Sequence, residues 1–431
     1  MRFVRELTSW SSGTADPEQF PYQAVVTEFH RVGKHFVKKE LLVQLDAARA
    51  RVNARTIPAR ELSAFLDVAL DKWDGRYDYR SYLALPLLPL STVAPEAGPG
   101  GRAAEEVDRP GSGGGRRERD RLLVDLVADA LAFELAASTD AIDLLPEQRP
   151  GPALSAKRCR LGVRAVASAL TRLGLAGAVT ERDPVAAAVA LHRLAVTGRD
   201  PARERTLALS MLPVYVSHDE YLFIRVLQAY ECVFAGVAEE LRGTIAALDT
   251  GRPRPAAGRL AYARELISGA GTLFSLLATM QPAAFRTFRE YTEGASAIQS
   301  RSYKLMESLC RTPEPERLDS TAYRSVPEVR EVVRAGQPSI DRAYRAAVRA
   351  GSLRGPDLDL VRQQMAAFAE AVLTWRRTHH RLAVRMLGAR SGTGYTEGTP
   401  YLAAVRAVPV FTTVSTDNRP PRTDPIGGCC E

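Results

Sequence analysis

The sequence has few histidines, and one of them occupies a position suited to binding a metal-containing group. Of the six histidines, His379 follows Trp375 by one helical turn on an apolar stripe. A single imidazole in an apolar wall can be the axial ligand of an iron centre. A core histidine hydrogen-bonded to a backbone carbonyl fits the same spacing, so both interpretations stay open. The adjacent His380 would point about 100° away on a helix, toward solvent or a carboxylate.

Two other side chains could bind a small polar substrate. His218 is predicted at the first position of a helix capped by Ser217, where the helix dipole disfavours the imidazolium form. A neutral imidazole there could hydrogen-bond to a substrate N–H, although a surface histidine has the same pattern. Arg289 follows Phe285 and Phe288. An arginine beside an apolar wall can bind a carboxylate through two parallel hydrogen bonds, and a solvent-facing arginine is the alternative.

The segments that carry these residues are predicted to be helical. Aromatic residues make up only 7% of the chain, and Ala, Leu, Val, Arg and Glu are abundant, a mixture that favours helix over sheet. Apolar residues recur at helical spacing without a convincing alternating pattern, so we expect an all-α fold. The expected helices cover residues 22–52, 59–72, 120–140, 155–175 and 184–197, one long helix from 217, one near 282, and 357–388. Capping-box patterns, which open helices, begin at Ser217 and at Ser296.

Two segments break the helical pattern and suggest a domain organisation. Gly, Pro and charged residues dominate 93–119, which predicts a flexible surface insertion, and 412–431 is expected to be a disordered tail. The remaining chain then divides into a helical N-terminal region, a second helical region that packs on the core, and a C-terminal core. These three parts are residues 1–92, 120–210 and 211–411.

Charge and cysteine content argue against several classes of function. The formal net charge is +8, but arginines and acids alternate, which predicts solvated helix faces rather than a nucleic-acid groove. The first residues, MRFVRELTSW, have no apolar signal segment, and no run of eighteen apolar residues occurs. We therefore expect neither a secretory signal nor a membrane span. The five cysteines form no CxxC pair, which favours reduced thiols in a cytoplasmic protein.

Three segments resemble the tryptophan 2,3-dioxygenase family, in the family's order and without gaps. SHDEYLFIRVLQAYE at 217–231 resembles the family's HDE-x-LFI helix. FREYTEGASAIQSRSYKLME at 288–307 resembles its FR-E-Y segment with ASGFQS. WRRTHHRLAVRMLGARSGTGYTEGTPYL at 375–402 resembles the segment that runs from W-R-x-x-H to GTGG and YL. The resemblance extends over roughly residues 211–402.

The resemblance implies a helical haem-binding bundle of the family's type with an extended helical N-terminal region. His379 corresponds to the proximal ligand of the iron of haem b, and the spacing selects it over His380. Ser296 and Gly392 belong to the family's cofactor pocket, and O₂ is the implied co-substrate. His218 corresponds to the distal, catalytic histidine that faces the indole nitrogen.

The implied substrate is tryptophan or a close analogue. Arg289 corresponds to the clamp on its carboxylate, and Thr393 to the threonine that holds its amino-acid end. Phe285 and Ser296 match substrate-facing positions of the pocket. The resemblance further implies C2–C3 dioxygenation of the indole to an N-formylkynurenine-type product, and a homo-oligomer, either a dimer or a tetramer.

Departures from the family pattern keep other outcomes open. Ala297, Ile298 and Lys304 replace a glycine, a phenylalanine and an arginine, and the lid loop contains Tyr395 and Glu397. A haem-dependent monooxygenase that yields an oxindole or a hydroxylated aromatic amino acid fits the altered lid. A non-catalytic haem-binding sensor, or an all-α interaction protein, is the alternative of another class.

Overall fold

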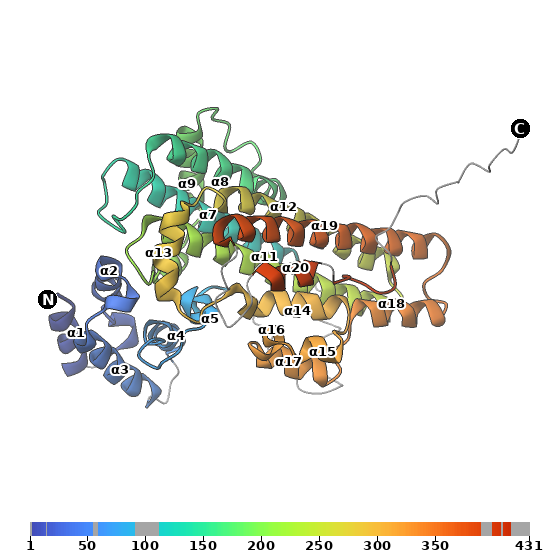
Figure 1. Ribbon diagram of the computed structural model, residues 1–431, viewed down its shortest axis with the longest axis horizontal. Coiled ribbons are helices and arrows are strands. Elements are labelled where there is room, and N and C mark those ends of the chain that lie inside the picture. The colour runs from blue at the N-terminus through green and yellow to red at the C-terminus, as the bar shows by residue number, and fades with distance from the viewer. Residues whose placement is uncertain are drawn as a thin grey trace, which may run out of the picture.

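A computed structural model describes residues 2–13, 15–54, 59–90, 112–388, 399–406 and 408–414. Within these ranges every regular element is an α- or 3-10 helix, and the sole β-type pairing is an isolated bridge between Glu147 and Ser217. The all-α prediction is therefore confirmed, and every described element in Figure 1 is a helix.

The N-terminal region forms its own apolar cluster at one end of the molecule (Figure 1). Phe29, Leu41, Leu45 and Phe65 are fully buried in this cluster, which also receives Leu212 from later in the chain. The region comprises α1 (Arg2–Ser12), η1 (Pro17–Gln19), α2 (Tyr22–Val32), η2 (Lys34–Phe36), α3 (Lys39–Asn53), α4 (Arg60–Ala69), α5 (Tyr79–Tyr82) and η3 (Leu85–Leu87).

The predicted single helix over 22–52 is wrong, because the chain breaks at Gly33. This glycine has φ +80°, and a Cβ there would lie 2.6 Å from the carbonyl oxygen of Val214. Only glycine allows this close approach. The break lets the amide of Lys34 donate to the carbonyl of Pro213 at 2.7 Å, so η2 is attached to the segment that precedes α11.

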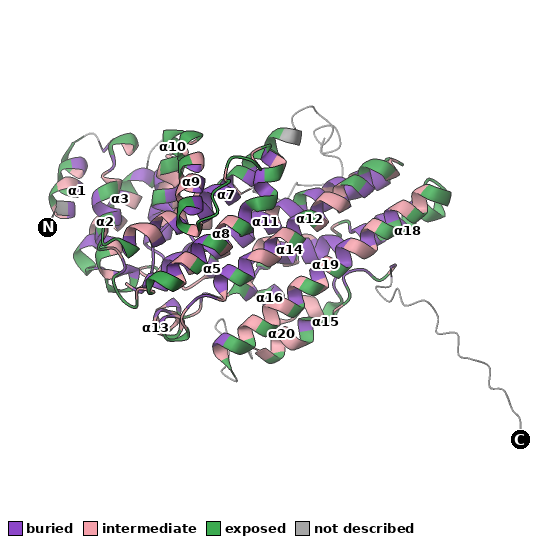
Figure 2. Ribbon diagram, turned by 90° about the horizontal axis from the view of Figure 1, so that it is seen from above, coloured by how far each residue is buried: buried purple, intermediate pink, exposed green. Residues whose placement is uncertain are grey.

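Helix α11 (His218–Asp249) is the centre of the structure. It is apolar enough to cross a membrane, but 83% of its most apolar window is buried inside the protein, as expected for a core helix. Figure 2 shows this burial along α11 and its neighbours. The surrounding helices are α7 (Ser112–Ser138), α8 (Pro152–Leu173), α9 (Pro184–Thr197), α10 (Pro201–Leu209), α12 (Pro253–Leu277), α13 (Pro282–Thr292), α14 (Arg301–Cys310), α18 (Ile340–Arg349) and α19 (Gly355–Leu387).

Short elements complete the C-terminal half. After α14 the chain forms a small lobe with its own apolar cluster around the fully buried Tyr323. The elements not yet named are η4 (Ala297–Gln299), α15 (Pro315–Leu318), α16 (Thr321–Arg324), α17 (Pro327–Arg334) and α20 (Thr399–Arg406).

Two predicted boundaries need correction. Residues 112–119 belong to α7 rather than to a flexible insertion, because Arg119 is buried against α11 and approaches Gly236; residues 93–111 lie outside the described residues. The predicted tail is ordered over 412–414. There the amide of Thr412 donates to the Asp341 carboxylate at 2.7 Å, whereas 415–431 lie outside the described residues.

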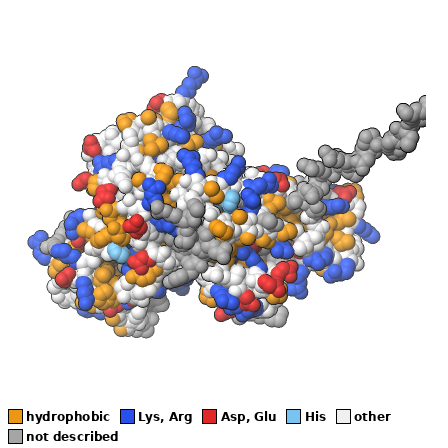
Figure 3. All heavy atoms as spheres, in the orientation of Figure 1, with side chains coloured by type: hydrophobic (Ala, Val, Ile, Leu, Met, Phe, Trp, Pro, Cys, Tyr) orange, Lys and Arg blue, Asp and Glu red, His pale blue; other side chains and the backbone are white. Residues whose placement is uncertain are grey.

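The charged side chains and the cysteines differ in where they lie. Figure 3 shows Lys, Arg, Asp and Glu side chains interspersed over one face of the molecule, without a continuous basic stripe on that face. Cys159, Cys232 and Cys310 are buried and free; Cys429 and Cys430 lie outside the described residues.

A buried ionic network joins α7, α8 and α11. Arg158 lies 3.0 Å from the Glu134 carboxylate and 2.6 Å from that of Asp219, and His218 Nε2 lies 3.0 Å from Glu134. The second Asp219 oxygen accepts the backbone N–H of Gln281, the residue before α13, at 2.6 Å. Burial raises the pKa of Glu134, but the His218 hydrogen bond and the Arg158 charge outweigh burial and lower it to about 2. The network therefore fixes α11 and the start of α13 together.

We predict that Glu134→Gln destabilises the fold, because it leaves Arg158 with one buried anion fewer. The free energy of unfolding at pH 7 should fall by about 3–5 kcal/mol, as for other broken buried pairs. The pKa of Glu134 is lower in the folded than in the unfolded chain, so its stabilisation is present above pH 4.5 and lost as pH falls toward 2. Urea titrations should thus show a smaller difference in the free energy of unfolding between variant and native protein at pH 3 than at pH 7. A difference of equal size at both pH values would contradict this account.

Candidate active site

A cavity of about 250 Å³ lies beside the face of α11 that is turned away from α7. Its walls come from α5, α11, α12, α13, η4, α14, α19 and α20, and most of the lining side chains are aromatic or aliphatic. Among the predicted site residues, His379, Arg289, Phe285 and Ser296 line this one cavity. The fold therefore brings together residues separated by about 90 positions in sequence.

His379 lies in an aromatic wall made by α12 and α19. Its ring stacks on Phe274 with centroids 5.8 Å apart and an interplanar angle of 14°, and lies 5.2 Å from the ring of Trp375. Burial lowers the pKa of His379 to about 4, with a smaller contribution from His380. The imidazole is therefore neutral at physiological pH, the form that binds a metal.

The surroundings of His379 fit a haem. Its ring nitrogens make no hydrogen bond to any described residue, so one of them is available to a group in the cavity. Among the described residues no cluster of three His, Cys, Asp or Glu side chains could hold a bare metal ion. A metal at His379 would need its other ligands from a prosthetic group, and an aromatic, apolar cavity suits a porphyrin.

Arg289 lies at a second aromatic wall, formed by α11 and α13. Phe223 has its ring centroid 5.6 Å from that of Phe285 and 5.3 Å from that of Phe288. Arg289 follows these phenylalanines on α13 and lines the cavity. A guanidinium on a wall of three rings that pack edge to face or tilted can pair with a carboxylate while the rings contact an apolar group.

Ser296 is held by the predicted capping box. The Gln299 side-chain oxygen accepts the backbone N–H of Ser296 at 3.1 Å, and the pair caps η4. The same oxygen accepts the N–H of Tyr79 at 2.9 Å, which connects α5 of the N-terminal region to the cavity wall. The capping box predicted at Ser217 is absent, because the Glu220 carboxylate turns back to bond the amides of residues 214 and 215.

A cationic cluster forms another part of the cavity wall. Lys304 and Arg376 line the cavity and are buried, and Arg317 lies behind them. Glu307 pairs with Arg317 at 3.0 Å and lies 3.7 Å from Lys304 and 3.9 Å from Arg376. Burial raises the pKa of Glu307, but these three cations outweigh burial and lower it to about 2. One carboxylate thus faces three cations, and the excess positive charge suits an anionic group in the cavity.

His218 does not lie at the cavity, so its assignment as the distal catalytic residue is corrected. Its side chain is 1% exposed and bonded to Glu134. The reason is helical periodicity: Leu227, nine residues later at about 100° per residue, lies on the opposite face of α11. Leu227 lines the cavity. Among the described residues, His379 is the only histidine in the cavity wall.

The remaining predicted residues, Thr393 and Gly392, lie outside the described residues. The lid residues Tyr395 and Glu397 fall in the same segment. Their roles stay predictions from the resemblance.

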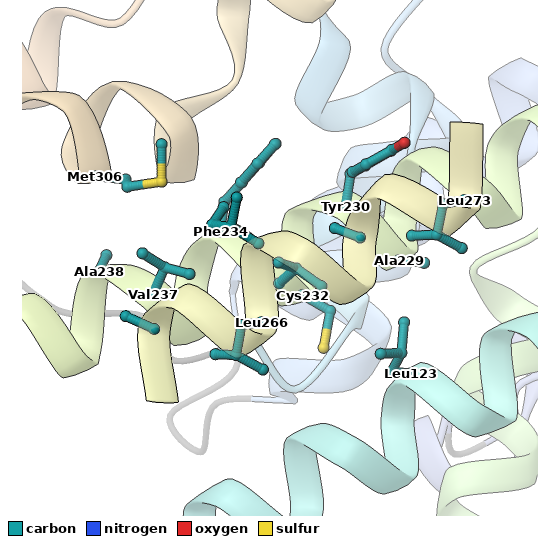
Figure 4. Packing of buried hydrophobic residues seen from close by; sticks show 14 of the residues in the cluster. Leu123, Ala229, Tyr230, Cys232, Phe234, Val237, Ala238, Leu266, Leu273 and Met306 are labelled. Carbon is teal, nitrogen blue, oxygen red and sulfur yellow. The ribbon is translucent and has the colours of Figure 1, made fainter. Parts of the chain in front are cut away.

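Several cavity residues escaped the sequence analysis. On α11, Phe223, Leu227, Tyr230 and Phe234 recur at helical spacing, and this pattern could have identified the cavity face. Figure 4 shows Tyr230 and Phe234 on one side of α11, and Cys232 on the other side toward α7. Tyr79 and Tyr82, from the N-terminal region, had no comparable signal, because only the tertiary fold brings them to this wall.

Comparison with known proteins agrees with this site. The family described as tryptophan 2,3-dioxygenase matches residues 208–365, which include Arg289 and Ser296 but end before His379. Relatives named tryptophan 2,3-dioxygenase share 29% identity over 234 residues in Bordetella pertussis, 28% over 216 in Nocardioides sp. and 27% over 234 in Burkholderia cenocepacia. The alignments cover 46%, 43% and 46% of this chain and 82%, 79% and 75% of the relatives, in that order.

Over these matched residues the chain is similar to the tryptophan 2,3-dioxygenase family. The N-terminal region, up to residue 207, lies outside the matched residues. Tyr79 and Tyr82, the residues that this region contributes to the cavity wall, therefore lie outside the family match.

We predict that His218→Ala acts on stability rather than on substrate binding. Removing the imidazole deprives buried Glu134 of a partner, and unfolding should require about 2–4 kcal/mol less. The affinity for L-tryptophan should change less than threefold, because the cavity face of α11 is untouched. Urea titration measures the change in stability, and calorimetry measures the affinity for L-tryptophan. Lost binding with unchanged stability would restore His218 to the active site.

Proposed function

We propose that this protein is a haem-dependent oxygenase of aromatic amino acids, which dioxygenates L-tryptophan at the C2–C3 bond to an N-formylkynurenine-type product. The observation that carries the proposal is that the neutral imidazole of His379 and the guanidinium of Arg289 line one aromatic cavity. A sensor of haem alone would not need the second group.

His379 would hold the haem iron, and the cationic wall would hold the haem carboxylates. When bound, haem supplies the iron centre at which O₂ is activated. Burial keeps the His379 nitrogen unprotonated and available as a ligand, and Phe274 and Trp375 fix the orientation of its ring. Lys304 and Arg376 supply positive charge that one buried carboxylate does not neutralise.

The opposite part of the cavity would orient the amino acid. Arg289 would pair with the carboxylate, which fixes one end of the substrate. The rings of Phe223, Phe285 and Phe288 would contact the aromatic side chain and exclude water. Ser296, held rigidly by its capping box, offers a hydroxyl close to the same wall.

The absence of a second histidine among the described wall residues favours a further candidate. Leu227 cannot hydrogen-bond to an indole N–H, so the cavity does not demand an indole. The second candidate function is therefore monooxygenation, in which one oxygen atom of O₂ enters an aromatic amino acid to give a hydroxylated product or an oxindole. An external two-electron reductant would reduce the other oxygen atom to water.

Isotope labelling tests the proposal. The haem-loaded protein is reduced without oxygen, supplied with L-tryptophan and ¹⁸O₂, and its product analysed by mass spectrometry. Two labelled atoms per product support dioxygenation, and one supports the monooxygenase. A haem-containing protein that oxygenates neither tryptophan nor tyrosine would contradict both and support the sensor.

We predict that His379→Ala purifies with little haem, since it removes the only described histidine of the cavity wall. Haem content is measured by the pyridine haemochromogen method. The matched control is His380→Ala, which removes the neighbouring imidazole and should retain haem. Normal haem in His379→Ala together with loss in His380→Ala would show that the ligand is misassigned.

Arg289→Ala should weaken L-tryptophan binding by roughly 30-fold or more, since an arginine–carboxylate pair is worth about 2–5 kcal/mol when one partner is removed. Haem content should not change, because the proposed ligand is on another helix. Tryptamine, which lacks the carboxylate, should bind the native protein poorly and be little affected by the substitution. Tight binding of tryptamine to the native protein would exclude the carboxylate clamp.

A further inference from the structure

The connection between α13 and η4 joins Arg289 to Ser296 and has a strained backbone. Glu293, which ends α13, has φ +51° and ψ −111°, a conformation that non-glycine residues rarely adopt. At the next residue, Gly294, a Cβ would lie 2.9 Å from the carbonyl oxygen of Tyr77. Strain of this kind persists only where surrounding contacts impose it, and here a close contact comes from the N-terminal region.

Lys72 of the N-terminal region makes a polar contact with the end of α13. Its Nζ donates to the carbonyl oxygen of Tyr291 at 3.0 Å and lies 3.9 Å from the Glu293 carboxylate. The ammonium also lies 4.2 Å from the centre of the Tyr77 ring. With its side chain only 13% exposed, Lys72 is enclosed between the N-terminal region and the end of α13.

Other N-terminal side chains hold the same connection. The ring of Tyr291 lies 5.1 Å from that of His35 and 4.9 Å from that of Phe36. His35 Nδ1 is 3.5 Å from Glu293. Figure 1 shows α13 between the N-terminal helices and the remaining helices. The end of α13 is thus held by contacts with the N-terminal region on the side away from the cavity.

The helix dipole explains why a cation stabilises the end of α13. The last carbonyls of α13 have no partner within the helix and carry the negative end of its dipole. A cation bonded to the Tyr291 carbonyl stabilises this turn, and Arg289 belongs to the same turn. Movement of this turn would displace the guanidinium from the carboxylate that it is proposed to bind.

We propose that Lys72 is a positioning residue that sets the affinity for the substrate carboxylate by fixing the last turn of α13. The inference rests on the proposed function of Arg289 and extends it to a region outside the family match. The N-terminal region therefore acts on substrate selection in this chain without Lys72 touching the substrate.

The test compares Lys72→Met and Lys72→Arg with native haem-loaded protein. Lys72→Met keeps the length of the side chain and removes its charge and donors, whereas Lys72→Arg keeps both. The matched control is Arg49→Met, which removes a cation of the same region that pairs with Asp46 and Asp74. Hydrogen exchange over residues 289–296 is measured without substrate, and binding of L-tryptophan and tryptamine is measured by calorimetry.

Lys72→Met should accelerate exchange in 289–296 and weaken L-tryptophan binding, each by about tenfold, the effect of losing one charged hydrogen bond. Tryptamine binding and exchange in α12 should stay unchanged, Lys72→Arg should restore most of the loss, and Arg49→Met should match native protein. Unchanged exchange in 289–296 would overturn the proposal whatever the substrate. Faster exchange with unchanged tryptophan affinity would also overturn it. If native protein binds no tryptophan, the proposed function fails, and the exchange result still decides whether Lys72 fixes this turn.

Discussion

The ion pairs of Arg158 with Glu134 and Asp219 fix the relative positions of α7, α8 and α11. Through its second oxygen, Asp219 also holds the amide that precedes α13. The cavity lies on the other face of α11, so the aromatic wall formed by α11 and α13 is built on two helices whose first residues this network holds together. The positions of the cavity side chains on α11 and α13 therefore depend on buried charges that do not line the cavity.

Charge is distributed unevenly around the cavity, and this distribution defines what the cavity can hold. His379 stays neutral because it is buried among aromatic rings, whereas Lys304 and Arg376 share one carboxylate, that of Glu307, with Arg317. The proposed metal ligand therefore lies in an apolar wall, and positive charge lies at the border of that wall. An apolar prosthetic group with acidic substituents would match both properties, and Arg289, which lines the same cavity, is the residue proposed to bind the carboxylate of an amino acid.

The sequence was informative where chemistry follows local periodicity. The position of His379 one turn after Trp375, the start of α11 at His218 and the cap at Ser296 all depend on neighbouring residues, and the structure has each of them. The prediction for His218 was wrong because it relied on residue type alone. The helical period places Leu227, and not His218, on the face of α11 that lines the cavity. Tyr79, Tyr82 and Lys72 could not be predicted, because their contacts join segments about 140 to 220 residues apart, a separation that no local pattern records.

The central claim is that haem and the amino acid share one cavity, and an optical titration of the purified ferric protein tests it most directly. L-tryptophan is added stepwise while the Soret band is recorded. The account predicts a Soret band that shifts with a saturable dependence on tryptophan, because the substrate would lie against the haem. A protein that takes up no haem when it is supplied, or a Soret band that tryptophan leaves unchanged while calorimetry shows binding, would contradict it.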